Sequence, residues 1–207
     1  MTPEQIERLR QDVLGYAARR KGKIYAPIDH PAFSDIKSEH GPERFEIIRP
    51  HIPEGAETAL DIGTHWGFFA HLLERQGLKV TAAENMKDYL PYLERIRDLY
   101  GDSFTIYPHS IFDMEGRLGF DVVLALNIFH HFIKTEALQD KLVDFLGRLD
   151  CQVMFFQAHS TAEGQMAGAF RNYEPEQFCE FIVDNSPLRS CERIGQVGAR
   201  PIFKIVR

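Results

Sequence analysis

The amino-acid sequence predicts a single α/β domain in which helices cover both faces of a mostly parallel β-sheet. Strand-like segments alternate with helical patterns from Thr58 onward, as in folds whose parallel strands are joined by right-handed helical crossovers. Residues 122–126 are all apolar, which is typical of a central strand buried on both faces. The last two strand-like segments are separated by residues 198–200, which favours a hairpin and therefore an antiparallel last strand.

Each element follows from a local pattern. In residues 3–20 apolar side chains recur every three or four positions, which predicts an N-terminal helix. Residues 25–40 are predicted to be irregular because Pro27 and Pro31 interrupt them, and residues 43–49 predict a short helix. Beyond this point the predicted strands are residues 58–62, 78–83, 104–107, 120–126, 153–156, 190–197 and 201–206. The predicted helices are residues 67–75, 88–100, 134–149 and 174–183.

Length, composition and charge limit the class of protein. The chain has 207 residues, of which 44% are hydrophobic, enough to bury the core of one ordinary domain. We expect residues 54–207 to form this domain and residues 1–53 to form a helical and irregular segment that covers the active site. The formal net charge of -6 argues against a large nucleic-acid surface, because phosphates bind to a cationic face. The polar start and the lack of a long apolar run predict a cytoplasmic protein with no membrane segment.

The cysteines and the adjacent histidines suggest no covalent or metal framework. Cys151, Cys179 and Cys191 are widely spaced and form no CxxC pair, unlike the cysteines of zinc sites or small secreted domains. We therefore expect three buried thiols and no disulfide. His130 and His131 are disfavoured as metal ligands, since neighbouring side chains after a strand point in opposite directions.

The most informative motif is the loop at residues 61–67, which reads Asp-Ile-Gly-Thr-His-Trp-Gly and joins a predicted strand to a predicted helix. Glycines at such a turn let a ligand lie against the backbone, and ligands in these folds bind beyond the carboxyl ends of the strands. The spacing is DxGxxxG rather than the GxGxxG of a pyrophosphate-binding loop, and its leading carboxylate suits a ligand with a cationic amine. Glu84 ends the next strand, where a carboxylate accepts both hydrogen bonds of a ribose diol.

Residues 58–67 and Glu84 together resemble the first motif and the ribose-binding acid of the class I S-adenosylmethionine-dependent methyltransferases. Residues 104–113 and 120–132 are similar to the adenine-binding and fourth-strand segments of that family. The resemblance extends from residue 58 to the C-terminus, and it implies a Rossmann-like, seven-stranded sheet whose last strand is antiparallel. It also implies S-adenosyl-L-methionine as the cofactor and S-adenosylhomocysteine as the product.

The resemblance implies a set of residues around the cofactor. Ser110 stands where many members have Asp, and Asp113 is expected to supply the adenine contact from the next turn. Asn127 is implied near the methionine part of the cofactor, while Trp66 either walls the pocket or packs between helix and sheet. The complete implied set is Asp61, Gly63, Thr64, His65, Trp66, Gly67, Glu84, Asn85, Ser110, Ile111, Asp113, Asn127 and Ile128.

Methyl transfer requires a nucleophile aligned with the methyl group and, for some acceptors, a general base. An imidazole accepts a proton near neutral pH, so His131 is the first candidate for the base and His130 the second. The alternative for either ring is to cap the fourth strand or to pack against the cofactor. The candidate substrate contacts, chosen for their position, are Tyr25, His159, Arg171 and Tyr173.

The leading hypothesis is an enzyme that methylates a small molecule. Residues 42–53 also look like the segment before the first motif in enzymes that modify the wobble uridine of tRNA with a carboxylated form of the cofactor. The acidic charge balance argues against a tRNA substrate. Another alternative is a partner subunit that binds the cofactor without turnover, and the DxGxxxG spacing disfavours a nicotinamide oxidoreductase. A homodimer is compatible with the sequence.

Overall fold

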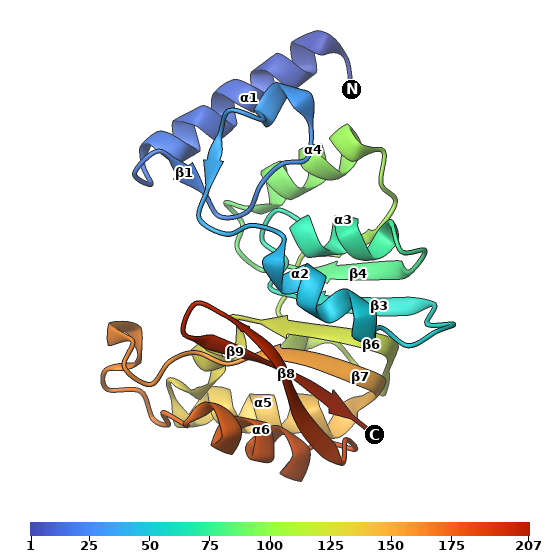
Figure 1. The fold of residues 1–207 in the computed structure, drawn as a ribbon, viewed down its shortest axis with the longest axis vertical. Helices are drawn as coiled ribbons and strands as arrows, with labels where there is room; N and C mark the ends of the chain where they lie inside the picture. Colours follow the sequence, from blue (N-terminus) through green and yellow to red (C-terminus); the bar gives the residue numbers. More distant parts are fainter.

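A seven-stranded sheet forms the centre of the protein, which the computed structural model describes over residues 1–207 (Figure 1). The strands follow the order β5-β4-β3-β6-β7-β9-β8, and all neighbours pair in parallel except β9, which is antiparallel to both β7 and β8. The predicted α/β fold with an antiparallel last strand is therefore confirmed. The strands are β3 (Thr58–Ile62), β4 (Lys79–Ala83), β5 (Thr105–Tyr107), β6 (Leu118–Leu126), β7 (Leu149–Gln157), β8 (Ser190–Val197) and β9 (Arg200–Val206).

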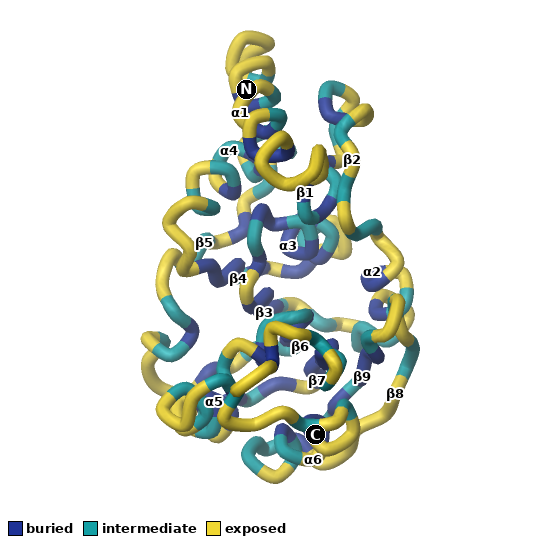
Figure 2. The backbone as a smooth tube through the Cα atoms, turned by 90° about the vertical axis from the view of Figure 1, so that its left-hand side faces the viewer, coloured by how far each residue is buried: buried dark blue, intermediate teal, exposed yellow.

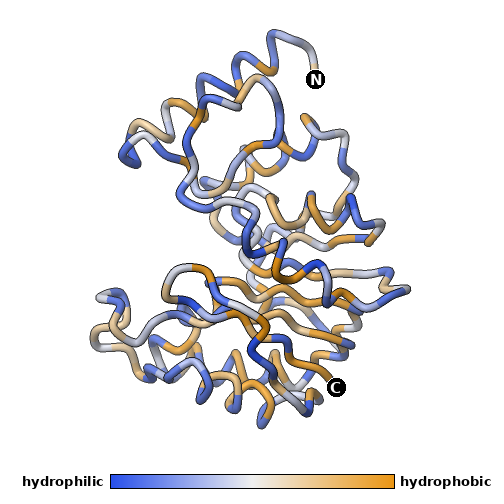
Figure 3. Tube along the Cα trace, viewed as in Figure 1, coloured by the Kyte–Doolittle hydropathy of each residue, from blue (hydrophilic) through white to orange (hydrophobic).

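Helices cover both faces of the sheet, as the alternating pattern predicts. One apolar cluster joins the sheet to α2, α3 and α4 through residues such as Phe45, Leu73 and Leu93. A second cluster joins the opposite face to α5 and α6 through residues such as Phe145 and Phe178. Figure 3 shows that hydrophobic residues are concentrated along the strands between these layers. The helices are α2 (Glu43–Ile48), α3 (Phe68–Glu74), α4 (Leu90–Tyr100), α5 (Glu136–Arg148) and α6 (Pro175–Asp184). None of the helices is long and apolar enough to cross a membrane.

The N-terminal segment packs beside α4 as a third apolar cluster. Its helix α1 (Pro3–Ala18) buries Leu9 and Val13 in this cluster, together with Trp66 and with Ile96 of α4. The outer face of α1 is exposed, as Figure 2 shows. The predicted division of the chain at residue 53 stays a prediction.

The region predicted to be irregular contains part of a small sheet. Strand β1 (Lys23–Ile24) pairs in parallel with β2 (Lys37–Ser38). Each strand has only two residues, which is too short for a periodic pattern that would predict it from the sequence. Short 3₁₀ helices complete the chain: η1 (Pro31–Phe33), η2 (Arg49–His51), η3 (Ile111–Asp113), η4 (Phe129–Ile133) and η5 (Gly164–Met166).

The expectation of three unpaired thiols is wrong for two of the cysteines. Cys179 in α6 and Cys191 in β8 form a disulfide with their Cα atoms 6.4 Å apart. Packing of α6 against β8 brings the two residues together, and no local spacing motif reports this contact. Cys151 is the free, buried cysteine.

Gly67 is required by packing as well as by backbone conformation. Its φ is +82°, and a Cβ there would lie 2.8 Å from Cδ1 of Leu93 and 3.1 Å from Cζ of Phe104. We expect Gly67→Ala to lower the free energy of unfolding by about 2 to 5 kcal/mol, the combined effect of left-handed strain and overpacking. Gly77→Ala is the matched control, because Gly77 has a φ of +91° but no heavy atom within 4 Å of the added Cβ. Chemical denaturation of both variants checks this expectation, and equal losses would contradict the packing argument.

Candidate functional site

The carboxyl ends of four parallel strands converge at one edge of the sheet. Asp61 in β3 pairs with Ala82 in β4 and with Leu124 in β6. Glu84 and Asn127 follow the last residues of β4 and β6. Because the strands are parallel and in this register, the loops after them share one edge, which is where ligands of such sheets bind.

A cavity of about 540 Å³ lies at this edge. It contains most of the predicted cofactor-binding residues, and Tyr25 and Arg20 of the N-terminal segment line it from the other side. Asn85 lies at its exposed rim. The predicted residues that line it are Tyr25, Gly63, His65, Glu84, Asn85, Ser110, Ile111, Asn127, Ile128 and His131.

Glu84 joins two loops of the cavity. Its carboxylate accepts hydrogen bonds from the backbone N–H of His65 at 3.0 Å and from that of Met86 at 2.8 Å. Only 6% of the residue is exposed, and this burial raises the pKa of its carboxyl above the ordinary value. The contacts hold the carboxylate in one orientation at the wall and leave further lone pairs for ligand hydroxyls.

Ser110 and Asp113 have different positions, although both were predicted to face the adenine. Ser110 lines the cavity, and its Oγ accepts a hydrogen bond from the N–H of Phe112 at 3.3 Å at the start of η3. Asp113 ends the same 3₁₀ helix, is exposed and lines none of the cavities described here. Asp113 thus lies outside these cavities, and its adenine contact stays a prediction.

Asp61 lies behind the main cavity, on a smaller one of about 30 Å³ that Arg44, Gly63 and Thr64 also line. Its carboxylate is 3% exposed and accepts a hydrogen bond from the Oγ1 of Thr64 at 2.6 Å. Burial raises the pKa of Asp61 to about 6, although the hydrogen bond from Thr64 and the charge of Arg44 act in the opposite direction. Asp61 is thus a buried carboxylate that a cationic ligand group would stabilise.

Arg44 is the functional candidate that the sequence reasoning missed. It belongs to α2 and is 2% exposed, and its Nη2 atom has no hydrogen-bond partner. Its Nη1 donates a weak hydrogen bond to the hydroxyl of Tyr25 at 3.4 Å, and its guanidinium lies 4.9 Å from the ring centre of Phe69. A buried guanidinium without a carboxylate is costly, which marks a site for an anionic group. Arg44 is four positions before the buried Ile48 and therefore lies on the same face of the helix. This position of a charged residue on an apolar helix face was the sequence signal that could have predicted its role.

Two residues of the site have strained backbones. His65 has a φ of 56° and Asn127 a φ of 57°, a left-handed conformation that is uncommon outside glycine. The side-chain amide of Asn127 donates to the hydroxyl of Tyr25 at 3.3 Å, and its Oδ1 is buried without a partner. Asn127 thus presents an unused acceptor at the cavity wall.

Aromatic rings surround both His65 and Trp66. The His65 ring centre lies 4.4 Å from that of Tyr89, and burial lowers the pKa of the imidazole to about 3, so the ring is neutral. Trp66 stacks on Tyr92 of α4 at 4.6 Å and packs against Tyr16 of α1 at 4.6 Å. Trp66 lines the small cavity but not the main one. Its principal contacts are therefore with helices α1 and α4 rather than with the main cavity.

A second cavity of about 670 Å³ adjoins the first. Both cavities are lined by Tyr25, Asn127 and His131, which therefore form the boundary between them. The lining is mostly polar and comes from segments far apart in sequence. Its remaining members are Glu39, His40, His130, Ser160, Ala162, Glu163, Gln165, Val197, Gly198, Ala199 and Arg200.

The adjacent histidines have different surroundings. His131 is exposed and lines both cavities, and partial burial together with the charges of Lys134 and Arg200 lowers the pKa of its imidazole. His130 is 3% exposed and lines only the second cavity. Burial, with a contribution from His131, lowers the pKa of His130 to about 3. His131 is therefore better placed to take a proton at the boundary.

Three predicted substrate contacts and one glycine lie outside both large cavities. His159 is 1% exposed, and its Nε2 lies 2.8 Å from the side-chain oxygen of Asn172, because the loop after β7 folds back over it. Arg171 is exposed and covers the ring of Phe170.

Tyr173 stacks on Phe181 of α6 at 5.3 Å, so apolar packing holds it away from the site. Gly67 begins α3, and its contacts are with the helix and strand behind the loop. None of His159, Arg171, Tyr173 and Gly67 lines either large cavity, and their ligand contacts stay predictions. Of the predicted substrate residues, Tyr25 is the one that reaches the cavities.

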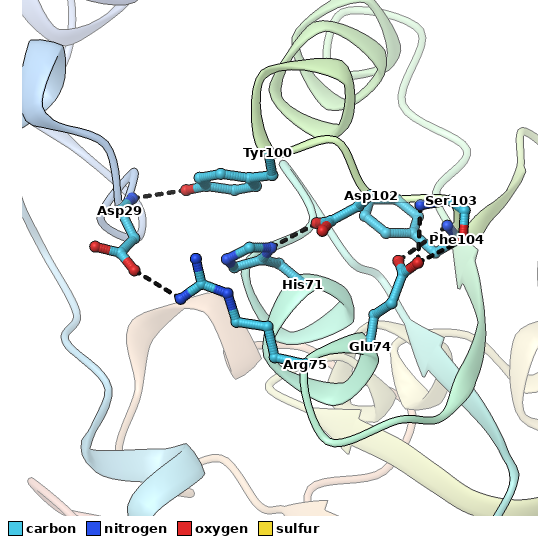
Figure 4. Close-up of polar contacts among 8 residues, drawn as sticks. All are labelled: Asp29, His71, Glu74, Arg75, Tyr100, Asp102, Ser103 and Phe104. Atoms are coloured by element: carbon cyan, nitrogen blue, oxygen red, sulfur yellow. Dashed lines mark hydrogen bonds and ion pairs between the residues drawn. The ribbon is translucent and has the colours of Figure 1, made fainter.

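A polar cluster fastens the N-terminal segment over this edge (Figure 4). The hydroxyl of Tyr100 accepts a hydrogen bond from the N–H of Asp29 at 2.6 Å, and the Asp29 carboxylate pairs with Arg75 at 2.9 Å. His71 of α3 stacks on Tyr100 with ring centres 3.7 Å apart and pairs with Asp102. These contacts connect the segment that contains Tyr25 to helices α3 and α4.

Solved structures resemble this fold, whereas neither a protein-family model nor a curated protein sequence matches the chain. Monomeric WbdD superposes with a TM-score of 0.74 at 18% identity, and the match covers 93% of this chain and 48% of that chain. The methyltransferase domain of bacterial CtHen1 gives a TM-score of 0.59 at 12% identity over 79% of this chain and 95% of that chain. Magnesium protoporphyrin IX methyltransferase (ChlM) from Synechocystis PCC 6803, with bound SAM, gives a TM-score of 0.57 at 14% identity. That match covers 80% of this chain and 76% of that chain.

The chain therefore has the fold of the class I S-adenosylmethionine-dependent methyltransferases, and the predicted resemblance is confirmed for the fold. WbdD is described as a bifunctional kinase-methyltransferase, and this chain spans about half the length of the WbdD chain that it matches, 48%. The comparisons lend no support to a tRNA-modifying enzyme or to a non-catalytic subunit.

Proposed function

We propose that the protein is a methyltransferase that uses S-adenosyl-L-methionine and methylates a small polar molecule. The observation that supports this function most directly is the pair of adjoining cavities at the carboxyl edge of the sheet. They share Tyr25, Asn127 and His131 as their boundary. We assign the cavity of about 540 Å³ to the cofactor and the cavity of about 670 Å³ to the acceptor, and both volumes lie in the usual range for small-molecule sites.

The cofactor has four chemical parts, and the residues of the first cavity and of the small cavity behind it together offer a partner for each. Glu84 would accept the hydrogen bonds of the ribose diol, and Ser110 would face the adenine beside Ile111. Asp61 would hold the ammonium group of the methionine part. Arg44, whose Nη2 has no partner within the protein, would hold its carboxylate. A zwitterion would thus neutralise both buried charges, which is why the residues fit this ligand.

The protein contributes orientation and one proton acceptor to the reaction. When bound, S-adenosylmethionine supplies an electrophilic methyl group on a sulfonium and leaves as S-adenosylhomocysteine. Asn127 and Tyr25 would orient the acceptor at the boundary of the cavities. The neutral imidazole of His131 would take the proton that the acceptor loses on methylation.

Calorimetric titration with S-adenosylmethionine tests the proposal, with NADH and NADPH as control ligands. We expect saturable binding of S-adenosylmethionine and none of either nicotinamide. Glu84→Ala is expected to weaken binding about 10- to 100-fold, because it removes a charge-assisted contact worth roughly 1.5 to 3 kcal/mol. Glu94→Ala, a change at an exposed position on α4, is the matched control. Absence of binding, or tighter binding of a nicotinamide, would refute the proposed function.

A further inference from the structure

The acceptor cavity has one cationic side chain, and that side chain is already paired with a carboxylate. Arg200 is the only lysine or arginine that lines it. Its Nε donates to Oε1 of Glu163 at 2.8 Å and its Nη2 to Oε2 at 2.6 Å, a bidentate pairing that uses one edge of the guanidinium fork. Both side chains are mostly buried, with 26% of Arg200 and 22% of Glu163 exposed.

Glu163 is itself held firmly in place. Its carboxylate accepts hydrogen bonds from the N–H of Ser160 at 2.9 Å and from the side-chain amide of Gln165, in addition to those of Arg200. Burial alone would raise the pKa of Glu163, but these hydrogen bonds and the charge of Arg200 lower it to about 2. The ion pair is therefore intact throughout the neutral range and presents a neutral unit to the cavity.

The other groups around the cavity are hydrogen-bonding but uncharged. Tyr25, Asn127 and Ser160 contribute a phenol, an amide and a hydroxyl. The pKa values of the lining imidazoles are lowered, chiefly by burial, so these rings are neutral as well. The remaining carboxylate, Glu39, is exposed at the rim. Apart from Glu39 at the rim, no charged side chain of the lining lacks an ion-pair partner.

This charge pattern limits the chemistry of the acceptor. Carboxylic acids and phosphates are anions at neutral pH, and alkyl amines are cations. Burying either ion without a partner of opposite charge is costly. Among polar nucleophiles that remain neutral at this pH, a hydroxyl group can both donate hydrogen bonds to and accept them from the phenol, amide and imidazole groups that line the cavity.

We propose that the acceptor is an uncharged, hydroxyl-bearing molecule, and that Glu163 determines this specificity by occupying Arg200 and so excluding anions. The identity of the methylated group rests on the proposed function. In that reaction the hydroxyl oxygen bonds to the methyl carbon, the carbon–sulfur bond breaks with its electron pair left on sulfur, and the hydroxyl proton passes to His131. The exclusion of anions is a property of the cavity alone and is measurable without cofactor.

Calorimetric titration of the cofactor-free protein with inorganic phosphate tests the role of Glu163. We expect no binding to the unchanged protein, and we expect Glu163→Gln to bind phosphate at least tenfold more tightly because it frees the Arg200 fork. The double variant Glu163→Gln with Arg200→Gln should lose this gain. Asp35→Asn is the matched control, since Asp35 holds Arg10 through two hydrogen bonds of 2.8 Å outside both cavities. Thermal unfolding of each variant verifies that it is folded.

Several results would overturn the proposal. Phosphate binding by the unchanged protein that Arg200→Gln abolishes would make the cavity an anion site. An equal gain in Asp35→Asn and Glu163→Gln, or no gain in a folded Glu163→Gln protein, would remove the assigned role of Glu163. A titration with methylammonium chloride tests the other sign of charge, and binding that Glu39→Gln abolishes would favour an amine acceptor. Failure of S-adenosylmethionine to bind, with the phosphate results as expected, would refute the proposed function but not the exclusion of anions.

Discussion

Replacement of Arg44 by methionine is expected to abolish tight binding of S-adenosylmethionine and to lower the free energy of unfolding, while leaving the protein folded. The guanidinium of Arg44 is buried, and its Nη2 has no partner. The charge of Arg44 lowers the pKa of the buried Asp61 carboxyl, so methionine would remove one of two neighbouring buried charges, a type of change that costs at most about 3 to 5 kcal/mol. The same change would leave the ligand carboxylate unpaired, at a cost of about 2 to 5 kcal/mol, or roughly 30- to several-thousand-fold in Kd.

Two comparisons make this prediction specific. The first is 5′-methylthioadenosine, which keeps the adenine and ribose but lacks the amino-acid part, so Arg44→Met should change its affinity little. The second is Arg49→Met, which removes an exposed cation at the end of the same helix and should leave the binding of both ligands unchanged. Calorimetry and thermal unfolding supply the two measurements. If Arg44→Met lowered the affinity for both ligands equally, the role of Arg44 would be to support the structure of the cavity rather than to pair with the ligand carboxylate.

The substitution Asp61→Asn is expected to stabilise the ligand-free protein above about pH 6 and to weaken its binding of S-adenosylmethionine. Burial raises the pKa of Asp61 from 3.8 to about 6. Between these pH values the native state holds more protons than the unfolded state, so stability falls as the pH rises. Above pH 6 the ionised carboxylate destabilises the protein by about 3 kcal/mol at most, and Asn removes this term while keeping an acceptor for Thr64.

Denaturation of the Asp61→Asn variant and the unchanged protein from pH 4 to pH 8 measures this effect. We expect the difference in unfolding free energy to be small near pH 4 and to grow up to about pH 6. Asp121 is the control of opposite sign, because hydrogen bonds from Glu57 and Thr58 lower the pKa of its carboxyl. Asp121→Asn should therefore lose stability by a nearly constant amount from pH 4 to pH 8, and this loss should shrink only below about pH 4, where Asp121 becomes protonated. A pH-independent effect of Asp61→Asn would show that burial of its charge is not the cause.

The sequence predicts those parts of the fold and site that depend on local pattern. Apolar runs locate the strands. Asp61 lies near the end of β3 and Glu84 directly after β4, which places both at one edge of a parallel sheet. Gly63 was predictable for the same reason, since a loop that turns sharply after a strand requires a left-handed residue. Its φ is +69°.

The missed features depend on contacts between distant segments. The pairing of Arg200 with Glu163 joins the hairpin after β8 to the loop after β7 across 37 positions. The disulfide depends on the packing of α6 against β8. Asp113 and His159 lie outside the two large cavities, and the number of residues after a strand does not determine which way a loop turns. His159 is held by its contact with Asn172 in the loop after β7.

Tyr25 lines all three cavities at this edge of the sheet, of about 30, 540 and 670 Å³, although it belongs to the segment that precedes the sheet. The sheet and its covering helices alone therefore do not contain all of the residues that line these cavities. A design that grafts this site onto another scaffold, or shortens the chain from its N-terminus, must retain the segment through His40 together with the Asp29 contacts to Arg75 and Tyr100. Without them, one cut would open both of the cavities that we assign to the cofactor and the acceptor to solvent at the same time.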